Sequence, residues 1–236
     1  MDGILVIDKP QGLTSFGVVA RIKKCINKQK VGHCGTLDPL ATGVLPLLLG
    51  KATKALPFLP DTRKEYIANF QFGITTDTQD ITGRILNFIK NSDKVFANKK
   101  EVLEILNEFI GDSLQIPPMY SALKHNGKRL YELARKGITV EREARSINIS
   151  KIKLLEFSEI DGNGKLLINC SKGTYIRTIC HDLGEKLGCG AVLTALRRIK
   201  SSGFTIDQSI PLKQIEEKPE EILNNLIICD AIQRFL

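Results

Sequence analysis

The order of hydrophobic and polar residues along the chain predicts strands that alternate with helices. Short apolar runs bounded by turn residues are typical of strands, and apolar residues spaced three or four apart are typical of helices with one buried face. Strands are predicted over residues 3–7, 44–49, 64–72, 84–89, 147–157 and 165–170. Helices are predicted over residues 14–26, 98–111, 130–136 and 176–187. Because the chain shows no internal repeat or linker, the pattern predicts one α+β unit over residues 1–236.

Local signals predict how two of the helices begin. Thr14 or Ser15 can cap the first helix, because a hydroxyl oxygen accepts a hydrogen bond from a backbone N–H of the first turn. The sequence Asn98-x-x-Glu101 has the spacing of a capping box. The apolar face of the first helix is predicted to consist of Phe16, Val19, Ile22 and Ile26.

Two strand pairings are predicted from the turns and the spacing of the apolar runs. Residues 147–157 and 165–170 flank the sequence Asp-Gly-Asn-Gly at 161–164, which is typical of a hairpin turn. Residues 84–89 are expected to be the partner of strand 64–72. Both predictions place consecutive strands side by side, which is the commonest arrangement in sheets.

Composition indicates a globular protein of the cytoplasm. The hydrophobic fraction is 42% and the mean hydropathy is −0.06. No apolar run approaches the roughly 20 residues that span a bilayer, and residues 1–10 lack the pattern of a signal peptide. The six cysteines are scattered with no Cys-x-x-Cys pair, so we expect reduced thiols and no zinc site.

The charge is positive and unevenly distributed. The net charge is +8, and residues 207–236 carry six acids and three bases, which leaves +11 on residues 1–206. Residues 121–150 contain seven Lys and Arg residues against three Glu residues. A dense basic segment on a basic body favours a polyphosphate partner such as a nucleic acid. A solvated surface that is rich in lysine is the alternative interpretation.

Residues 32–43 form the most unusual segment of the chain, with the sequence Gly-His-Cys-Gly-Thr-Leu-Asp-Pro-Leu-Ala-Thr-Gly. Three glycines permit backbone angles that other residues resist, and Pro39 fixes φ directly after Asp38. The segment is followed by the apolar run of residues 44–49. We therefore expect this segment to present the carboxylate of Asp38 in a defined direction.

Several motifs of cofactor and metal chemistry are absent from the sequence. Gly43-x6-Gly50-Lys51 has the wrong spacing for a phosphate loop, and no two of the three histidines are four residues apart, as a zinc hydrolase would require. There is no Gly-x-Ser-x-Gly elbow and no complete calcium loop. An enzyme with this sequence is expected to use no metal and no cofactor, with Asp38 as its main reactive group.

Residues 32–43 closely resemble the catalytic motif of the bacterial tRNA pseudouridine-55 synthases. Five further blocks resemble this family in the same order along the chain. They are residues 8–15 (Asp-Lys-Pro-Gln-Gly-Leu-Thr-Ser), 64–66 with 73–80, 117–124, 172–178, and Leu196-Arg197-Arg198. The resemblance covers nearly all of residues 3–206 and implies the pseudouridine synthase fold, a mixed and mainly antiparallel sheet flanked by helices.

The resemblance implies the isomerisation of one uridine in the T-arm of tRNA, position 55, by a base-flipping mechanism without cofactor. The N1–C1′ bond breaks, the uracil rotates, and C5 bonds to C1′. Asp38 is the catalytic residue in this interpretation, and it must be ionised. Three roles remain open for it: addition to C1′, addition to C6, or removal of a ribose proton.

The family motif carries substrate-binding roles over to four other residues. Tyr66 is expected to stack on the target uracil, and assistance in removal of the C5 proton stays open as a second role. An aromatic residue at this position in a strand is often only a core residue. His33 is expected to contact the RNA where the base leaves the stack. Tyr175 is expected against the base, and Arg177 is expected to favour the ionised form of Asp38. Asp80 either joins a charge network with Arg177 and Asp38 or is a solvated loop acid.

The basic segment is implied to be an insertion, at about residues 121–150, that closes over the RNA. Its candidate contacts to the RNA backbone are Lys124, Lys128, Arg129, Arg135 and Lys136, around a turn at residues 125–127. Lys9 is a weaker candidate that either contacts phosphate or only ends its strand.

The resemblance also implies a monomer that acts on tRNA without a guide RNA. Many members of the family continue into a small β-rich RNA-binding domain, which is not expected in this chain after the acidic segment 207–236. Two other functions stay open on the same fold: a pseudouridine synthase for a different RNA site, and a tRNA chaperone without catalysis.

Overall fold

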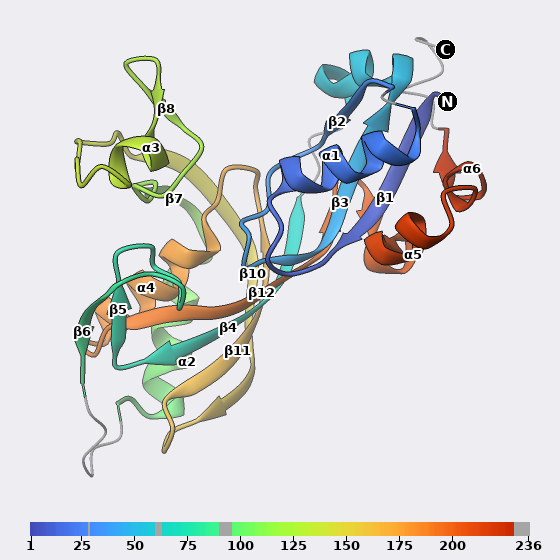
Figure 1. The fold of residues 1–236 in the computed structure, drawn as a ribbon. Helices are drawn as coiled ribbons and strands as arrows, with labels where there is room; N and C mark the ends of the chain where they lie inside the picture. Colours follow the sequence, from blue (N-terminus) through green and yellow to red (C-terminus); the bar gives the residue numbers. More distant parts are fainter. Residues whose placement is uncertain (28, 60–62, 90–95, 229–236) are drawn as a thin grey trace. The chain divides into compact units, whose positions relative to one another are not determined.

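The computed structural model of the chain describes residues 1–27, 29–59, 63–89 and 96–228 (Figure 1). The chain forms two compact units: a first unit of Met1–Tyr66 and Leu196–Leu236, and a second unit of Ile67–Ala195. Two strands, β4 (Lys64–Phe72) and β12 (Ala191–Ser201), continue from one unit into the other. The mixed sheet with helices confirms the predicted α+β class. That residues 1–236 act as one catalytic domain remains a prediction.

The first unit is built on the strand order β14-β1-β3-β12. Strand β1 pairs antiparallel with β3, and both strands are buried along almost their whole length. A strand that is covered on both faces shows a continuous apolar run in place of an alternating pattern, as the sequence of β1 and β3 does. Strand β1 also pairs with β14 (parallel) and with β15 (antiparallel). Strand β3 also pairs with β2 (antiparallel) and with β12 (parallel). Strand β12 pairs antiparallel with β13.

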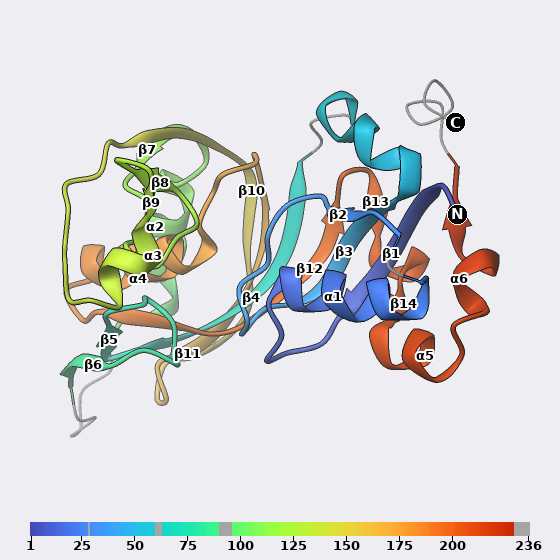
Figure 2. The same cartoon turned by 45° about the horizontal axis from the view of Figure 1, so that its top comes forward.

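The strands of the first unit have the following bounds: β1 (Gly3–Lys9), β2 (Val31–His33), β3 (Thr42–Leu49), β13 (Phe204–Thr205), β14 (Ile210–Pro211) and β15 (Leu226–Ile227). Its helical segments are α1 (Ser15–Cys25), η1 (Gly50–Phe58), η2 (Ile206–Gln208), α5 (Leu212–Glu217) and α6 (Glu221–Asn224). Helix α1 lies next to β2 and α5 (Figures 1 and 2).

The predicted cap of α1 is confirmed, but part of its predicted buried face is wrong. The Thr14 hydroxyl accepts a hydrogen bond from Gly17 N at 2.9 Å. The buried stripe of the helix runs through Ser15, Val18, Val19 and Ile22. Phe16 lies beside this stripe with 71% of its surface exposed, because the stripe begins at Ser15 and passes through Val18 one turn later.

The second unit contains the strand order β12-β4-β11-β10-β7. Strands β10 (Arg145–Ser158) and β11 (Asn163–Cys170) form the predicted antiparallel hairpin, and β7 (Gly111–Gln115) pairs antiparallel with β10. Phe70, Phe72 and Phe157 form an aromatic cluster on these strands, with ring centroids 4.9–6.2 Å apart. The alternation of β4 and β11 between buried and half-buried residues agrees with a sheet that has one covered face.

The predicted partner of residues 84–89 is wrong. Strand β6 (Ile85–Phe88) pairs with β5 (Ile74–Thr76) and does not pair with β4. The neighbours of β4 in the sheet are β11 and β12, so neither edge of β4 is available to β6. Gly73, with φ +81°, ends β4 and lets the chain enter the separate hairpin of β5 and β6.

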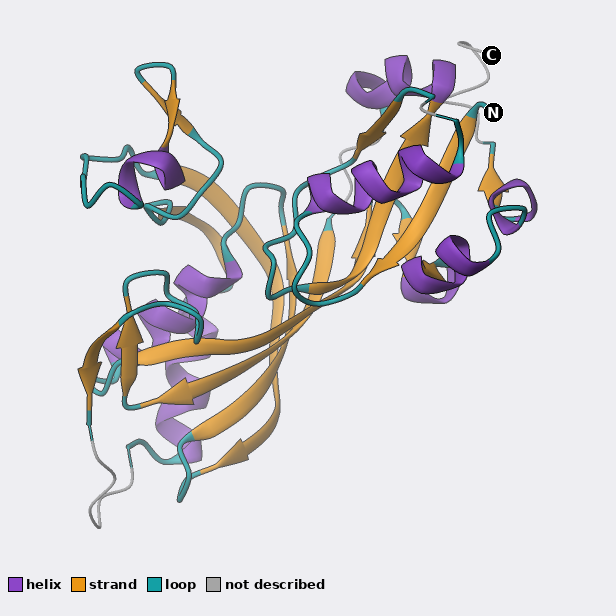
Figure 3. Ribbon diagram, viewed as in Figure 1, coloured by secondary structure: helices purple, strands orange, loops and turns teal. Residues whose placement is uncertain are grey.

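The helices of the second unit agree with the predictions within a few residues. They are α2 (Lys99–Glu108), α3 (Leu130–Ala134) and α4 (Ile176–Lys186), and a small hairpin is formed by β8 (Lys124–His125) and β9 (Lys128–Arg129). The capping box of Asn98 and Glu101 is present. Helices α2 and α4 lie next to each other beside the strands (Figures 1 and 3). Among the described residues, no helix is long and apolar enough to cross a membrane.

Candidate active site

The loop that carries Asp38 connects β2 to β3 in the first unit and is held by a buried serine. The Ser15 hydroxyl, at the start of α1, accepts a hydrogen bond from Leu37 N at 2.8 Å and lies 3.2 Å from Leu37 O. Because Leu37 directly precedes Asp38 and Ser15 is buried, these contacts fix the backbone next to the carboxylate. Asp38 itself is half-buried, and its carbonyl accepts a hydrogen bond from Ala41 N at 3.0 Å.

Lys9 holds the other side of the Asp38 loop. Its side chain is fully buried, and Nζ donates to Leu13 O at 2.6 Å and Pro10 O at 2.9 Å and lies 3.5 Å from Pro39 O. Gly12 N also donates to Pro39 O at 2.8 Å. A fully buried ammonium group that is bonded to carbonyls has no surface for RNA, so Lys9 does not serve as the phosphate contact proposed from the sequence. The alternative interpretation, a lysine that organises the end of its strand, agrees with these contacts.

Burial lowers the pKa of Lys9 to about 8, because an ammonium group loses its hydration in the interior. The negative charge of Asp38 opposes this shift, and the positive charge of Arg198 adds to it. The charges of Asp38 and Arg198 thus both act on the ammonium group of Lys9 within the first unit.

Arg198 on β12 is a second buried cation beside the loop. Its side chain has no exposed surface, and Nε donates to Val44 O at 2.8 Å. The two terminal nitrogens donate to Thr36 O at 3.4 Å and Gly35 O at 3.3 Å. In the sequence, Arg198 was only part of the segment Leu196-Arg197-Arg198 that resembles the family, and its hydrogen bonds to the Asp38 loop were not predicted. The signal available was an arginine on a strand, but its carbonyl partners have no signature in the sequence.

His33 and Tyr66 also belong to the first unit. His33 ends β2 and pairs with Leu47 of β3, with its side chain half-buried. Burial and then the charge of Arg198 lower the pKa of His33, so its imidazole is neutral near pH 7. Tyr66 lies on β4 with 6% of its surface exposed. The roles of both residues toward RNA remain predictions.

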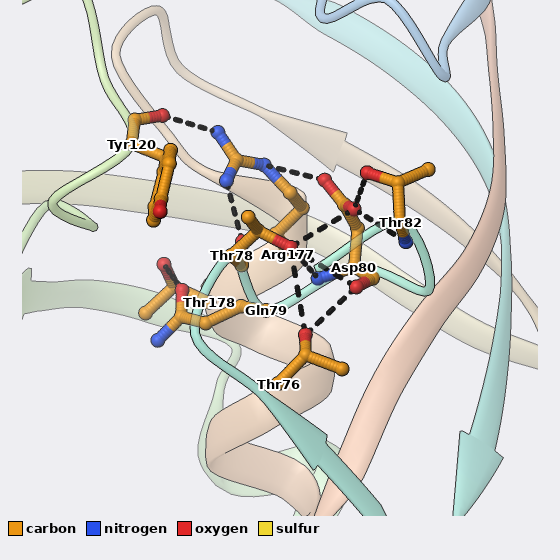
Figure 4. A network of polar contacts seen from close by, with 8 residues as sticks. All are labelled: Thr76, Thr78, Gln79, Asp80, Thr82, Tyr120, Arg177 and Thr178. Atoms are coloured by element: carbon orange, nitrogen blue, oxygen red, sulfur yellow. Dashed lines mark hydrogen bonds and ion pairs between the residues drawn. The ribbon is translucent and has the colours of Figure 1, made fainter. Parts of the chain in front are cut away.

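The second unit contains a buried network centred on Arg177, in the first turn of α4 (Figure 4). The two terminal nitrogens of Arg177 donate to Thr78 O at 2.6 Å and to Tyr120 O at 2.9 Å. Nε lies 3.9 Å from Oδ2 of Asp80, and the Arg177 residue is 3% exposed. The guanidinium group thus joins three separate segments of the unit.

Asp80 is a buried acid with a defined orientation. Its Oδ1 accepts hydrogen bonds from Thr78 Oγ1 at 3.0 Å and from Thr82 N at 3.0 Å (Figure 4). The Thr82 hydroxyl donates to the same oxygen. The alternative of a solvated loop acid is therefore wrong, and the predicted association of Asp80 with Arg177 is present.

Tyr175 is held at the start of α4 by a residue that the sequence did not indicate. Tyr175 N donates to Gln115 Oε1 at 2.8 Å, and Gln115 Nε2 donates to Tyr175 O at 3.1 Å. Gln115 is buried at the end of β7, whereas Tyr175 is half-buried. The amide of Gln115 fixes the backbone two residues before Arg177, so it positions both side chains.

The five candidate RNA-backbone residues of the basic segment are all exposed on the second unit. Lys124, Lys128 and Arg129 belong to the β8–β9 hairpin, whose turn residues Asn126 and Gly127 have φ values of +49° and +80°. Positive φ at both central residues is the geometry of a tight type I′ hairpin turn. Arg135 and Lys136 follow α3.

Two arginines lie near one aromatic ring in this basic segment. The guanidinium carbons of Arg129 and Arg135 lie 5.8 Å and 5.3 Å from the ring centroid of Tyr131. In the described part of the chain, none of the five candidate bases forms an ion pair. Exposed lysine and arginine side chains without an ion-pair partner can contact phosphates. A solvated surface remains the alternative interpretation.

Two known families match the chain, one after the other along the sequence. The family described as TruB family pseudouridylate synthase (N terminal domain) matches residues 23–176. The family described as tRNA pseudouridylate synthase B C-terminal domain matches residues 177–228. Together the two matches include Asp38, Asp80, Arg177 and Arg198.

Curated relatives with the name tRNA pseudouridine synthase B match over most of the chain. The protein of Clostridium tetani is 50% identical over 218 residues, which are 92% of this chain and 74% of the relative. The protein of Clostridium perfringens (strain 13 / Type A) is 48% identical over 228 residues, 97% of this chain and 75% of the relative. The protein of Syntrophotalea carbinolica is 47% identical over 240 residues, 100% of this chain and 76% of the relative.

Two solved structures share the fold. One is a Cbf5-Nop10-Gar1 complex, with a TM-score of 0.71 and 29% identity over 98% of this chain. The other is an H/ACA RNP bound to a substrate RNA containing 2′-deoxyuridine, with a TM-score of 0.68 and 26% identity over 99% of this chain. The chain spans 58% of the length of each of these two relatives.

Proposed function

Since the chain belongs to the TruB family of pseudouridylate synthases, we propose that it converts one uridine of tRNA, position 55 in the T-arm, to pseudouridine. The contact that supports this proposal best is the buried Ser15–Leu37 pair, which fixes the backbone immediately before Asp38. A catalytic carboxylate has to be held in one direction toward its target atom, and such backbone contacts provide that.

The reaction is an isomerisation, so its atoms balance without any co-reactant. The N1–C1′ bond breaks, C5 bonds to C1′, the proton at C5 leaves, and N1 gains a proton. Asp38 supplies the reactive carboxylate in one of the three roles that remain open. Extrusion of the uridine from the stacked loop costs a few kcal/mol, which contacts to the flipped base and to the phosphates must offset.

The other residues take the roles that the family resemblance gives them. In the first unit, Tyr66 stacks on the uracil and assists removal of the C5 proton, and His33 contacts the RNA at the vacated position. In the second unit, Tyr175 contacts the base. Arg177 contributes to substrate binding, and Asp80 orients Arg177. The contacts of Arg177 and Asp80 with each other support the last of these roles.

The basic segment binds the RNA backbone in this proposal, with tRNA alone as the macromolecular partner. We infer a monomer that works without a guide RNA and acts in the cytoplasm, where tRNA is found. A pseudouridine synthase for another RNA and a tRNA chaperone without catalysis are the competing functions.

The proposal is tested by incubating the protein with an unmodified tRNA transcript and with a T-arm hairpin, both labelled with tritium at C5 of uridine. Pseudouridine formation releases this tritium to water, because the C5 proton leaves during the reaction. Mapping the product by position should place it at position 55 in both RNAs. Product at another position indicates a different RNA site, and RNA binding with no product indicates a chaperone.

We expect Tyr66→Phe to lower the rate of tritium release by about 100-fold, because removal of a group that assists proton transfer typically costs 10²–10⁴-fold. The substitution keeps the aromatic ring, so RNA affinity should not change. Tyr131→Phe on α3 is the matched control and should keep the normal rate. A normal rate for Tyr66→Phe would limit Tyr66 to stacking.

We expect the double substitution Lys128→Gln with Arg135→Gln to weaken tRNA binding at low salt and to reduce the slope of log affinity against log salt by up to about 2. Each phosphate contact contributes nearly one unit to this slope. Lys100→Gln on α2, where Lys100 pairs with Glu104, is the matched control. A slope equal to that of the unmodified protein would assign the segment to a solvated surface.

A further inference from the structure

Arg198 ties together the two ends of the loop that carries Asp38. The loop leaves β2 after His33 and enters β3 at Thr42. The terminal nitrogens of Arg198 bond to Gly35 O and Thr36 O at the outgoing end, and Nε bonds to Val44 O at the incoming end. One rigid guanidinium group therefore bonds to backbone carbonyls at both ends of the loop that carries Asp38.

The backbone of Arg198 holds the same loop from the strand side. Gly43 pairs with Arg198 in the parallel ladder of β3 and β12. A Cβ atom at Gly43 would lie 2.2 Å from Arg198 O, so only glycine permits this close approach. Gly43 also has φ +101°, which other residues rarely adopt. Side chain and backbone of Arg198 thus act on the loop together.

The positive charge of Arg198 indicates an electrostatic role in addition to its hydrogen bonds with the loop. Its hydrogen-bond partners are three backbone carbonyls, and among the described residues no carboxylate forms an ion pair with it. A buried charge is costly, whereas a neutral amide could donate hydrogen bonds to carbonyls at less cost. The positive charge acts on Lys9 and His33 in the same loop environment, and the charge of Asp38 also reaches Lys9.

We propose that Arg198 is a positioning residue for the reaction: its guanidinium group sets the direction of Asp38 and supplies positive charge beside the loop. The roles that the family resemblance implies do not include this function. The inference rests on the proposed function, because it assigns a role in the chemistry of Asp38.

The test compares Arg198→Lys and Arg198→Gln with the unmodified protein in single-turnover tritium release, at a temperature well below the melting temperature of each protein. Lysine keeps the charge but cannot bond to both ends of the loop, so we expect a rate about 10-fold lower. Glutamine also removes the charge, so its rate should fall further. The tRNA dissociation constant should stay within about 2-fold for both, since Arg198 has no exposed surface.

Ile215→Ala on α5 is the control for lost stability, because Ile215 is fully buried in the same unit and its side chain has no polar atom that could bond to the loop. It should lower the melting temperature and leave the rate unchanged. A normal rate for Arg198→Lys and Arg198→Gln overturns the inference, and so does failure of both to fold, which would make Arg198 purely structural. Failure of the proposed function gives a different result: the unmodified protein itself then forms no pseudouridine in any RNA. Failure of the Arg198 inference requires an unmodified protein that is active.

Discussion

Asp38→Asn is expected to abolish pseudouridine formation, with a rate at least about 10³-fold lower, while tRNA binding is retained. Loss of a single essential reactive group typically costs this much or more. Asparagine has nearly the same shape as aspartate, and the loop is held by Ser15, Lys9 and Arg198 through backbone atoms, so its structure should persist. The measurements are single-turnover tritium release and a filter-binding titration with the same tRNA.

Asp8→Asn is the matched control for this experiment. Asp8 is a carboxylate in the same unit, at the end of β1, where it pairs with Arg197 at 2.7 Å. Because this pair is partly exposed, its loss should cost roughly 1 kcal/mol or less of stability and should not change the rate. A fully active Asp38→Asn protein would remove Asp38 from the mechanism.

Arg177→Met is expected to lower the single-turnover rate by about 10³-fold, and Arg177→Lys by about 10²-fold. Removing one preorganised electrostatic group from an active site commonly costs 10²–10³-fold, and lysine keeps the charge without the planar fork. All three nitrogens of the Arg177 guanidinium group are engaged in this protein: the two terminal nitrogens bond to Thr78 O and Tyr120 O, and Nε faces Asp80. The tRNA dissociation constant separates a loss of chemistry from a loss of binding.

The Arg177 substitutions also carry a stability cost that must be measured separately. Arg177→Met leaves two carbonyls without their donor and Asp80 without its cation, and breaking a buried charged pair costs about 3–5 kcal/mol. Thermal melting of each variant shows whether it is folded at the assay temperature. Arg21→Met, which breaks an exposed pair with Glu216, is the control and should change neither rate nor melting by much. Equal rates for Arg177→Lys and the unmodified protein would contradict the assigned role.

Elements with a strong local signal were predicted well from the sequence. The capping box at Asn98 and Glu101 begins α2, and the turn around residues 161–164 joins β10 to β11. These features depend on hydrogen bonds and backbone angles within a few residues of one another. The pairing of residues 84–89 was wrong because it depends on which edge of β4 is free, and β11 and β12, which come much later in the chain, occupy both neighbouring positions.

The candidate site was predicted in part. Asp38 was predicted from the glycine-rich segment around it and from the family motif, and its catalytic role remains a prediction. The structure shows how its loop is held. The proximity of Asp80 and Arg177 was one of two alternatives in the sequence, and only the burial of both side chains decided between them. Gln115, which holds Tyr175, had no signal in the sequence at all.

The sequence by itself determined the fold class and the family, and it pointed to Asp38 as the reactive carboxylate, which remains a prediction. These follow from periodicity and from motifs, which are properties of residue types and their spacing. The tertiary structure decided what the cations do: Lys9 and Arg198 are buried and hold the Asp38 loop, whereas Lys124 and Lys128 are exposed. The physical reason is that Lys9 and Arg198 bond to backbone carbonyls. Every residue has such a carbonyl, so the sequence cannot indicate which ones a lysine or an arginine will meet.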